Sequence, residues 1–141
     1  MPTLDEDTCR QRMGSAPVAR LATLRPDGTP RLVPITFAVV DGLVCSAVDR
    51  VKPKSGKRLA RLRDVDRDPR VELLADVYDD DWSRLWWVRL DATAAEHTGG
   101  ELRGRALDAL QRKYPPYRDE RPDGPVLVLT PTAWTGWTAQ R

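Results

Sequence analysis

The sequence of 141 residues has few of the residues that build metal centres or disulfide frameworks. It has two cysteines, Cys9 and Cys45, which form no Cys-x-x-Cys pair, and one histidine, His97. This composition argues against a disulfide-stapled fold, fits a reducing cytosol and offers no cluster of metal ligands. No apolar run approaches membrane-spanning length, and the acidic start has no apolar signal segment. We therefore expect a cytoplasmic protein with no membrane partner.

A strong excess of charge of one sign is also missing. The chain carries 23 Lys and Arg residues against 21 Asp and Glu residues, a formal net charge of +2. Two positive charges are too few to argue for nucleic acid as a partner. There is no internal repeat and no low-complexity linker, and the length suits one domain over residues 1–141.

No side chain pattern predicts a catalytic nucleophile. The serines Ser46, Ser55 and Ser83 lack the Gly-x-Ser-x-Gly turn that exposes a nucleophile. A lone histidine near a strand end is more often a surface residue than a general base. The aspartates at 79–81 lack the spacing of a calcium loop and are interpreted as a solvated loop. The sequence thus names no catalytic residue and no metal site.

Alternation of apolar and polar residues predicts a mainly β protein of the α+β class. Strands are expected at 17–24, along a run through Val33, Ile35, Phe37 and Val39, and at 43–48, 71–77, 84–95 and 126–137. Residues 17–48 are predicted to form a three-stranded antiparallel meander, with a tight turn at Asp41-Gly42. Helices are expected at 5–13, at 55–65 with Ser55 as N-cap, and from 100 to 113. Six mostly antiparallel strands with short flanking helices favour a small closed barrel.

The most informative segment is basic. Residues 49–63 carry seven basic side chains against one acid, Asp49. They are Arg50, Lys52, Lys54, Lys57, Arg58, Arg61 and Arg63. A basic turn that leads into a helix N-terminus is suited to bind a phosphate. The alternative is a solvated amphipathic helix with incidental positive charge.

Tryptophan is the second concentrated feature. The chain has five, at positions 82, 86, 87, 134 and 137. Tryptophan suits subunit interfaces and planar ligands, although a barrel core would also use it. Trp86 and Trp87 are adjacent on one predicted strand and must point to opposite faces. One of them is therefore expected to meet a partner chain or a ligand. A phosphate cradle beside aromatic residues, without a reactive side chain, suits a protein whose bound cofactor does the chemistry.

These features together resemble the pyridoxamine 5′-phosphate oxidase-like split β-barrel family of flavin and deazaflavin oxidoreductases. The similarity is greatest to its actinobacterial branch of probable F420-dependent enzymes. It runs over nearly the whole chain, through residues 19–31, 33–37, 51–54, 68–71, 78–89, 114–117 and 134–137. The order and spacing of these segments carry the resemblance. It implies an antiparallel split barrel of the FMN-binding type and a homodimer with cofactor sites between the subunits.

The resemblance also implies roles for individual residues. Pro34, Ile35 and Thr36 would face the cofactor ring, and Ser46, Ala47 and Val48 would contact it. Arg50, Lys52, Lys54 and Lys57 would hold its phosphate or acidic tail. Trp86, Trp87 and Arg89 would close the site from the other subunit.

The function that follows is an oxidoreductase that moves a hydride between F420 and a small conjugated substrate. FMN is the alternative cofactor. A non-catalytic carrier or sensor of flavin, deazaflavin or a haem-like ligand is the alternative function. The oligoglutamate tail of F420 adds negative charge beyond one phosphate, so the basic segment favours F420 over FMN.

Overall fold

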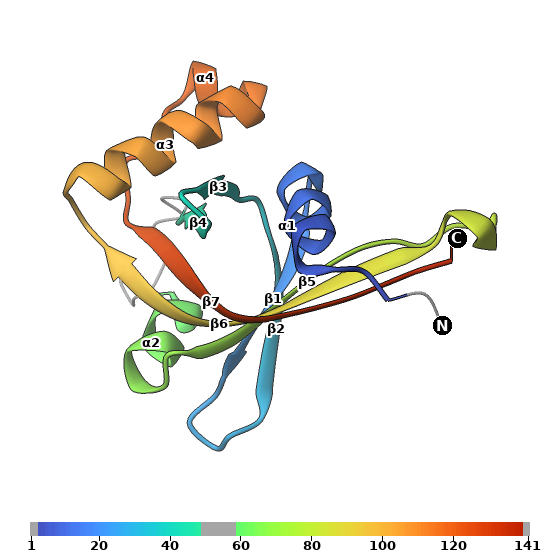
Figure 1. The fold of residues 1–141 in the computed structure, drawn as a ribbon. Coiled ribbons are helices and arrows are strands. Elements are labelled where there is room, and N and C mark those ends of the chain that lie inside the picture. Colours follow the sequence, from blue (N-terminus) through green and yellow to red (C-terminus); the bar gives the residue numbers. More distant parts are fainter. Residues whose placement is uncertain (1–2, 49–58, 140–141) are drawn as a thin grey trace.

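The computed structural model describes residues 3–48 and 59–139. In chain order its elements are α1 (Glu6–Ser15), β1 (Ala19–Leu24), β2 (Pro30–Ile35), β3 (Ala38–Val40), β4 (Leu43–Ala47), α2 (Ala60–Arg67), β5 (Arg70–Val77), the 3-10 turn η1 (Trp82–Arg84), β6 (Trp86–His97), α3 (Glu101–Lys113), α4 (Pro115–Asp119) and β7 (Val126–Thr138). Figure 1 shows that α3 and α4 lie together over β3 and β4.

Within the described ranges, seven strands form one antiparallel sheet in the order β2-β1-β5-β6-β7-β4-β3. Strands β2 and β3 are its two edges and do not pair with each other. The mainly β architecture with flanking helices is confirmed. The predicted count of six strands and the closed barrel are wrong, because the sheet has a seventh strand and two open edges.

The difference arises in the run that alternation joined into one strand. Its first part pairs with β1, as in Leu21 with Val33, and its last part pairs with β4, as in Val39 with Val44. The first and last antiparallel pairings of the expected meander over residues 17–48 are therefore present, but its single middle strand is wrong, because β2 and β3 lie at opposite edges of the sheet. Phe37, in the link between β2 and β3, is fully buried like Ile35, but the pattern of burial changes after it. Ala38 and Val40 are buried and Val39 is 42% exposed, so, contrary to the prediction, Val39 does not share the face of Ile35 and Phe37. The apolar alternation of the sequence thus continues through the break, whereas the buried face does not.

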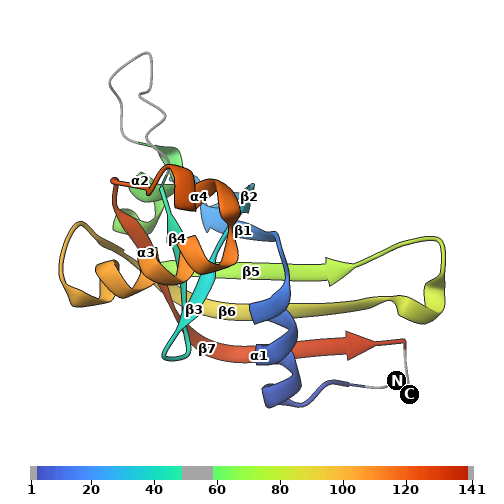
Figure 2. The ribbon, with the colours of Figure 1, turned by 90° about the horizontal axis from the view of Figure 1, so that it is seen from above.

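The long strands β5, β6 and β7 run side by side and reach beyond the helices (Figure 2). Alternation on β6 is as predicted, since Val88 and Leu90 are buried and Arg89 between them is exposed. Strand β7 has a bulge at Thr132. This residue is left unpaired between the pairs Ala92–Pro131 and Asp91–Ala133.

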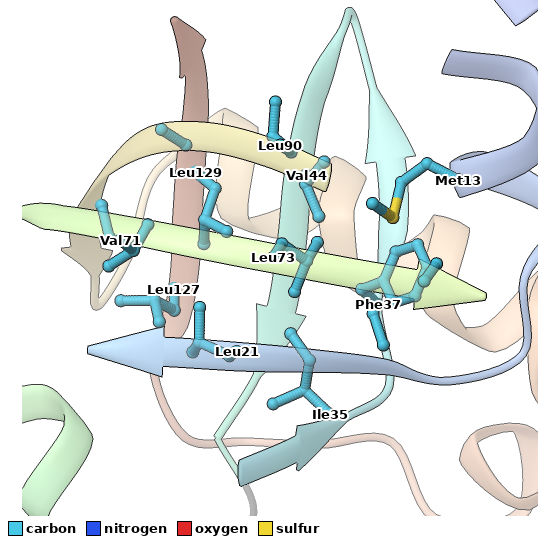
Figure 3. Close-up of a cluster of buried hydrophobic side chains, with 14 of the residues drawn as sticks. Met13, Leu21, Ile35, Phe37, Val44, Val71, Leu73, Leu90, Leu127 and Leu129 are labelled. Atoms are coloured by element: carbon cyan, nitrogen blue, oxygen red, sulfur yellow. The ribbon is translucent and has the colours of Figure 1, made fainter. Parts of the chain in front are cut away.

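The core lies on the face of the sheet that α1 and α2 cover. Leu21, Leu73 and Leu90 meet Phe37 from the β2–β3 link and Met13 from α1 (Figure 3). A second cluster packs α3 against the opposite face of β4 and β7. These two strands are therefore covered on both sides, which explains why residues 44–47 and 126–129 are buried without alternation.

The helices begin and end near the expected positions at 5–13 and 100–113. The predicted helix 55–65 corresponds to α2, which begins later, at Ala60, because Leu59 before it has non-helical backbone with ψ 140°. The N-cap position is therefore taken by Leu59 and not by Ser55, which lies outside the described residues. Helices long and apolar enough to cross a membrane are absent from the ranges 3–48 and 59–139. The cysteines Cys9 and Cys45 are both buried and unpaired.

Candidate cofactor site

A hollow of about 200 Å³ opens where β2 and β4 meet the helices α2 and α4. Its lining comprises Val18, Pro34, Ile35, Thr36, Ser46, Ala47, Arg61 and Tyr117. Five of the six residues expected to surround the cofactor ring therefore lie together. The sixth, Val48, is buried just beyond Ala47 and does not line the hollow.

Thr36 is fixed from two directions at this hollow. The Ser46 hydroxyl donates to the Thr36 carbonyl oxygen at 2.7 Å, which ties β4 to the end of β2. The Thr36 hydroxyl lies 2.7 Å from the Tyr117 hydroxyl of α4. These bonds give the hollow a defined polar wall beside the apolar side chains of Pro34 and Ile35.

The next residue, Phe37, is held by the end of α3. Its N–H donates to the Tyr114 hydroxyl at 3.1 Å, so a side chain satisfies an amide that has no partner strand. Lys113 donates from Nζ to the Phe37 carbonyl oxygen at 3.0 Å and lies 3.8 Å from the centre of the Phe37 ring. Burial lowers the pKa of Lys113 to about 8. The link between β2 and β3, which contains Thr36 and Phe37, is therefore held against the end of α3.

The end of β4 is held by the segment before β7. The Val48 N–H donates to the Pro125 carbonyl oxygen at 3.0 Å. A Cβ added to Gly124 would lie 2.8 Å from the Val48 carbonyl oxygen, so this close approach requires glycine. Arg103 of α3 donates to the Gly124 carbonyl oxygen at 2.9 and 3.2 Å. The residues predicted to bind phosphate, Arg50, Lys52, Lys54 and Lys57, lie outside the described residues, so their role stays a prediction.

Helix α2 brings Arg61 to the hollow and is anchored by a buried carboxylate. Asp64, with 2% of its side chain exposed, accepts from Arg31 Nε at 2.7 Å and from Arg67 at 3.1 Å. It also accepts from the Thr23 hydroxyl at 2.7 Å. Burial acts to raise the pKa of Asp64, but these bonds outweigh it and hold the pKa at about 2. Asp64 therefore attaches α2 to β1 and β2 as a charged group.

Trp86, Trp87 and Arg89 lie away from this hollow in the same chain. Trp86 packs against the core, with the Arg12 guanidinium 5.4 Å from its ring centre. Trp87 alternates to the other face, opposite Trp137, and the Arg89 guanidinium is 5.4 Å from its ring centre. The expected opposite orientation is confirmed. Their role in closing a site of another subunit stays a prediction.

A larger hollow of about 510 Å³ lies over β1, β5 and β6, on the sheet face opposite the core. Glu72 and Asp91 face each other across the strands there. A hydrogen bond with Asp91, burial and the Asp91 charge raise the pKa of Glu72. Groups of three or more residues able to hold a metal ion are absent from the part of the chain that the structure describes.

Sequence reasoning did not assign Tyr117 or Tyr114 to the site. The segment Tyr114-Pro-Pro-Tyr117 carries part of the family resemblance, which gives neither tyrosine a role. The residues 115–119 form the short helix α4, whose Tyr117 side chain turns back toward β2. The sequence feature that could have indicated these residues is the pair of tyrosines around two prolines. Prolines fix the backbone, and a tyrosine held on such a backbone presents a polar hydroxyl in a defined position.

Comparison with known proteins agrees with this arrangement. The pyridoxamine 5′-phosphate oxidase family matches residues 5–138. No curated protein matches the sequence.

Three solved structures illustrate the similarity of fold. A conserved hypothetical protein of Mycobacterium tuberculosis has a TM-score of 0.79 and 20% identity, over 96% of this chain and 86% of that one. A FAD-binding protein of Mesorhizobium loti has a TM-score of 0.71 and 19% identity, over 96% and 93%. A haem-binding protein of Mycobacterium smegmatis has a TM-score of 0.70 and 19% identity, over 93% and 56%.

The family match covers nearly the whole sequence and therefore identifies the family of this chain. The chain belongs to the pyridoxamine 5′-phosphate oxidase family, and its sheet with flanking helices is the fold of that family.

Proposed function

We propose that the hollow at β2 and β4 binds the ring of a flavin or deazaflavin nucleotide, and that the protein is an F420-dependent oxidoreductase. The observation that carries this proposal is that Pro34, Ile35, Thr36, Ser46 and Ala47 line one hollow together with Arg61 of α2. When bound, the reduced cofactor would donate a hydride to a small conjugated substrate, or the oxidised cofactor would accept one from it.

The residues of the chain fit such a group. The apolar side chains of Pro34 and Ile35 suit a planar ring, and the Thr36 and Ser46 hydroxyls suit polar atoms at its edge. Arg61 lies at the hollow, on the helix that follows the basic residues 50–57, where it would meet the phosphate or tail. The protein's contribution is binding, orientation and exclusion of water, so no single side chain is expected to be indispensable.

F420 is the first candidate because the basic segment extends onto α2. Arg61 lies on α2, and Lys57 precedes the N-cap residue Leu59 in the sequence, so the two would contact an acidic tail from the helix and from the basic segment before it. FMN or FAD is the second candidate, since a FAD-binding protein shares the fold. The test is titration of F420, FMN and FAD into the native protein and into Lys57→Ala/Arg61→Ala. Tighter FMN binding by the native protein, or equal loss of every cofactor in the variant, would refute recognition of the tail.

The phosphate-binding role of the basic turn has its own test. We expect Lys52→Ala and Lys54→Ala each to weaken cofactor binding about tenfold, because a charge-assisted contact is lost. The loss should shrink at high salt, since part of the attraction is screened. Unchanged affinity in both variants would show that these lysines only face solvent.

A binding function without catalysis is the second proposal. Its support is that the described residues lining the hollow include no pair arranged for acid–base or nucleophilic chemistry, and that a haem-binding protein shares the fold. The enzyme and the non-catalytic binding protein are distinguished by adding reduced F420 with a panel of conjugated acceptors and measuring whether the F420 is oxidised. Tight binding without turnover of any acceptor would favour the carrier or sensor.

We also propose that the protein acts as a homodimer with the cofactor between two copies. The hollow of about 200 Å³ is smaller than the usual 300–1,000 Å³ of ligand pockets, so a second chain would have to complete it. Trp82 is 77% exposed and Leu32 is 71% exposed, which gives apolar area for such a contact. Light scattering at micromolar concentration tests this, and a monomer mass would contradict it.

A further inference from the structure

The Thr36 and Tyr117 hydroxyls form a pair at the wall of the hollow. Their oxygens are 2.7 Å apart, and either one could donate to the other. Two hydroxyls carry two protons, and only one of these lies between the oxygens. Over residues 3–48 and 59–139 neither hydroxyl has another hydrogen-bond partner. The pair therefore has one O–H left, on residues that both line the hollow.

Tyr117 is held in place by helix α3. The Gln111 side-chain amide donates to the Tyr117 carbonyl oxygen at 2.9 Å. Arg118 donates to the carbonyl oxygens of Gln111 and Arg112 at 2.8 and 2.7 Å. The ring of Tyr114 meets that of Tyr117 edge-on, with centres 5.7 Å apart. A side chain fixed in this way presents its hydroxyl without a large loss of freedom on binding.

We propose that Tyr117 is a positioning residue that orients the Thr36 hydroxyl, so that the pair donates one hydrogen bond to a carbonyl oxygen or ring nitrogen at the edge of a planar heterocycle. This inference rests on the proposed function, because the heterocycle is the cofactor ring. It assigns the segment Tyr114-Pro-Pro-Tyr117 two separate tasks. Tyr114 holds the backbone of Phe37, and Tyr117 serves the hollow.

The matched variants are Tyr117→Phe and Tyr114→Phe, which each remove one hydroxyl from the same motif. FMN and F420 are titrated into both, with the absorption spectrum of the bound cofactor and the melting temperature as further readouts. Tyr117→Phe should bind about tenfold more weakly and shift the spectrum, because the hydrogen bond to the ring edge is lost. Tyr114→Phe keeps the ring that meets Tyr117, so it should lower the melting temperature more than Tyr117→Phe does and shift the spectrum of the bound cofactor less.

Thr36 supplies the second arm of the experiment. Thr36→Val keeps the shape and removes the hydroxyl, so it should weaken binding as Tyr117→Phe does, whereas Thr36→Ser should retain most of the affinity. The variant Thr36→Val/Tyr117→Phe should bind no more weakly than the worse single variant, because the two act as one unit.

The outcomes separate the two proposals. Native affinity and an unshifted spectrum in Tyr117→Phe would overturn the positioning role while the proposed function stands. Additive losses in the double variant would overturn the pairing of Tyr117 with Thr36. A native protein that binds neither FMN nor F420 would refute the proposed function, and the positioning role with it.

Discussion

Replacing Asp64 by Asn should be one of the most destabilising conservative changes in this protein. The carboxylate is buried and accepts from Arg31, Thr23 and Arg67, which join β1 and β2 to α2. An amide has one oxygen for these three donors and turns its own N–H₂ toward a guanidinium. Loss of one partner of a buried ion pair costs about 3–5 kcal/mol. The two arginines are 30% and 39% exposed, so we expect about 3 kcal/mol.

The matched control is Asp68→Asn. Asp68 also has its pKa lowered to about 2, by hydrogen bonds from Arg70, but Arg70 is 75% exposed. An exposed pair of this kind contributes little to stability, because water screens the attraction between its charges. Urea unfolding at pH 7, followed by tryptophan fluorescence, compares the two variants with the native chain. A loss in Asp64→Asn no larger than in Asp68→Asn would refute the buried anchor.

The dependence on pH provides a second check of the same reasoning. The pKa of Asp64 falls from an ordinary 3.8 to about 2 on folding. A lowered pKa means that this stabilisation is fully present above pH 4 and is lost as the pH falls toward 2. The stability difference between the native chain and Asp64→Asn should therefore shrink over this range. A difference that is constant between pH 5 and pH 2 would contradict a charged Asp64.

Two further predictions concern packing and charge. Gly124→Ala should cost about 2 kcal/mol, because its Cβ would meet the Val48 carbonyl oxygen, whereas Gly104→Ala, with nothing within 4 Å, should stabilise α3 slightly. Equal melting temperatures for these two variants would contradict the close approach. Glu72→Gln should stabilise by about 0.5 kcal/mol at pH 7, because it removes the repulsion with Asp91 across the strands. The pKa of Glu72 is raised on folding, so this gain should disappear below pH 4 in urea unfolding measurements. A gain that persists at pH 3 would contradict the repulsion.

The sequence predicted single elements well and their neighbours less well. Alternation along residues 84–95 assigned the buried and exposed faces of β6, because that pattern is local. It joined β2 to β3 because Val33, Ile35, Phe37 and Val39 keep a period of two in the sequence, although Val39 is exposed in the structure. The link between β2 and β3 is held by contacts distant in sequence, such as Tyr114 with Phe37, 77 positions apart. Such a contact leaves no periodic pattern in the sequence, so alternation could not predict it.

The residues of the candidate site were also predicted only in part. The resemblance assigned Pro34, Ile35, Thr36, Ser46 and Ala47, and these residues line one hollow. Tyr117 was not assigned, because its hydroxyl meets Thr36 across 81 positions of sequence. Trp86, Trp87 and Arg89 were assigned to a site of another subunit, and one chain by itself does not test that assignment.

The central claim is that the hollow at β2 and β4 binds the ring of a flavin or deazaflavin cofactor. A crystal structure of the protein grown with F420, and a second grown with FMN, tests it most directly. We predict density for the ring against residues 34–36 and 46–47, with the phosphate directed toward Arg61. Density for the ring in the larger hollow beside Glu72 and Asp91, or none in either crystal, would contradict the claim.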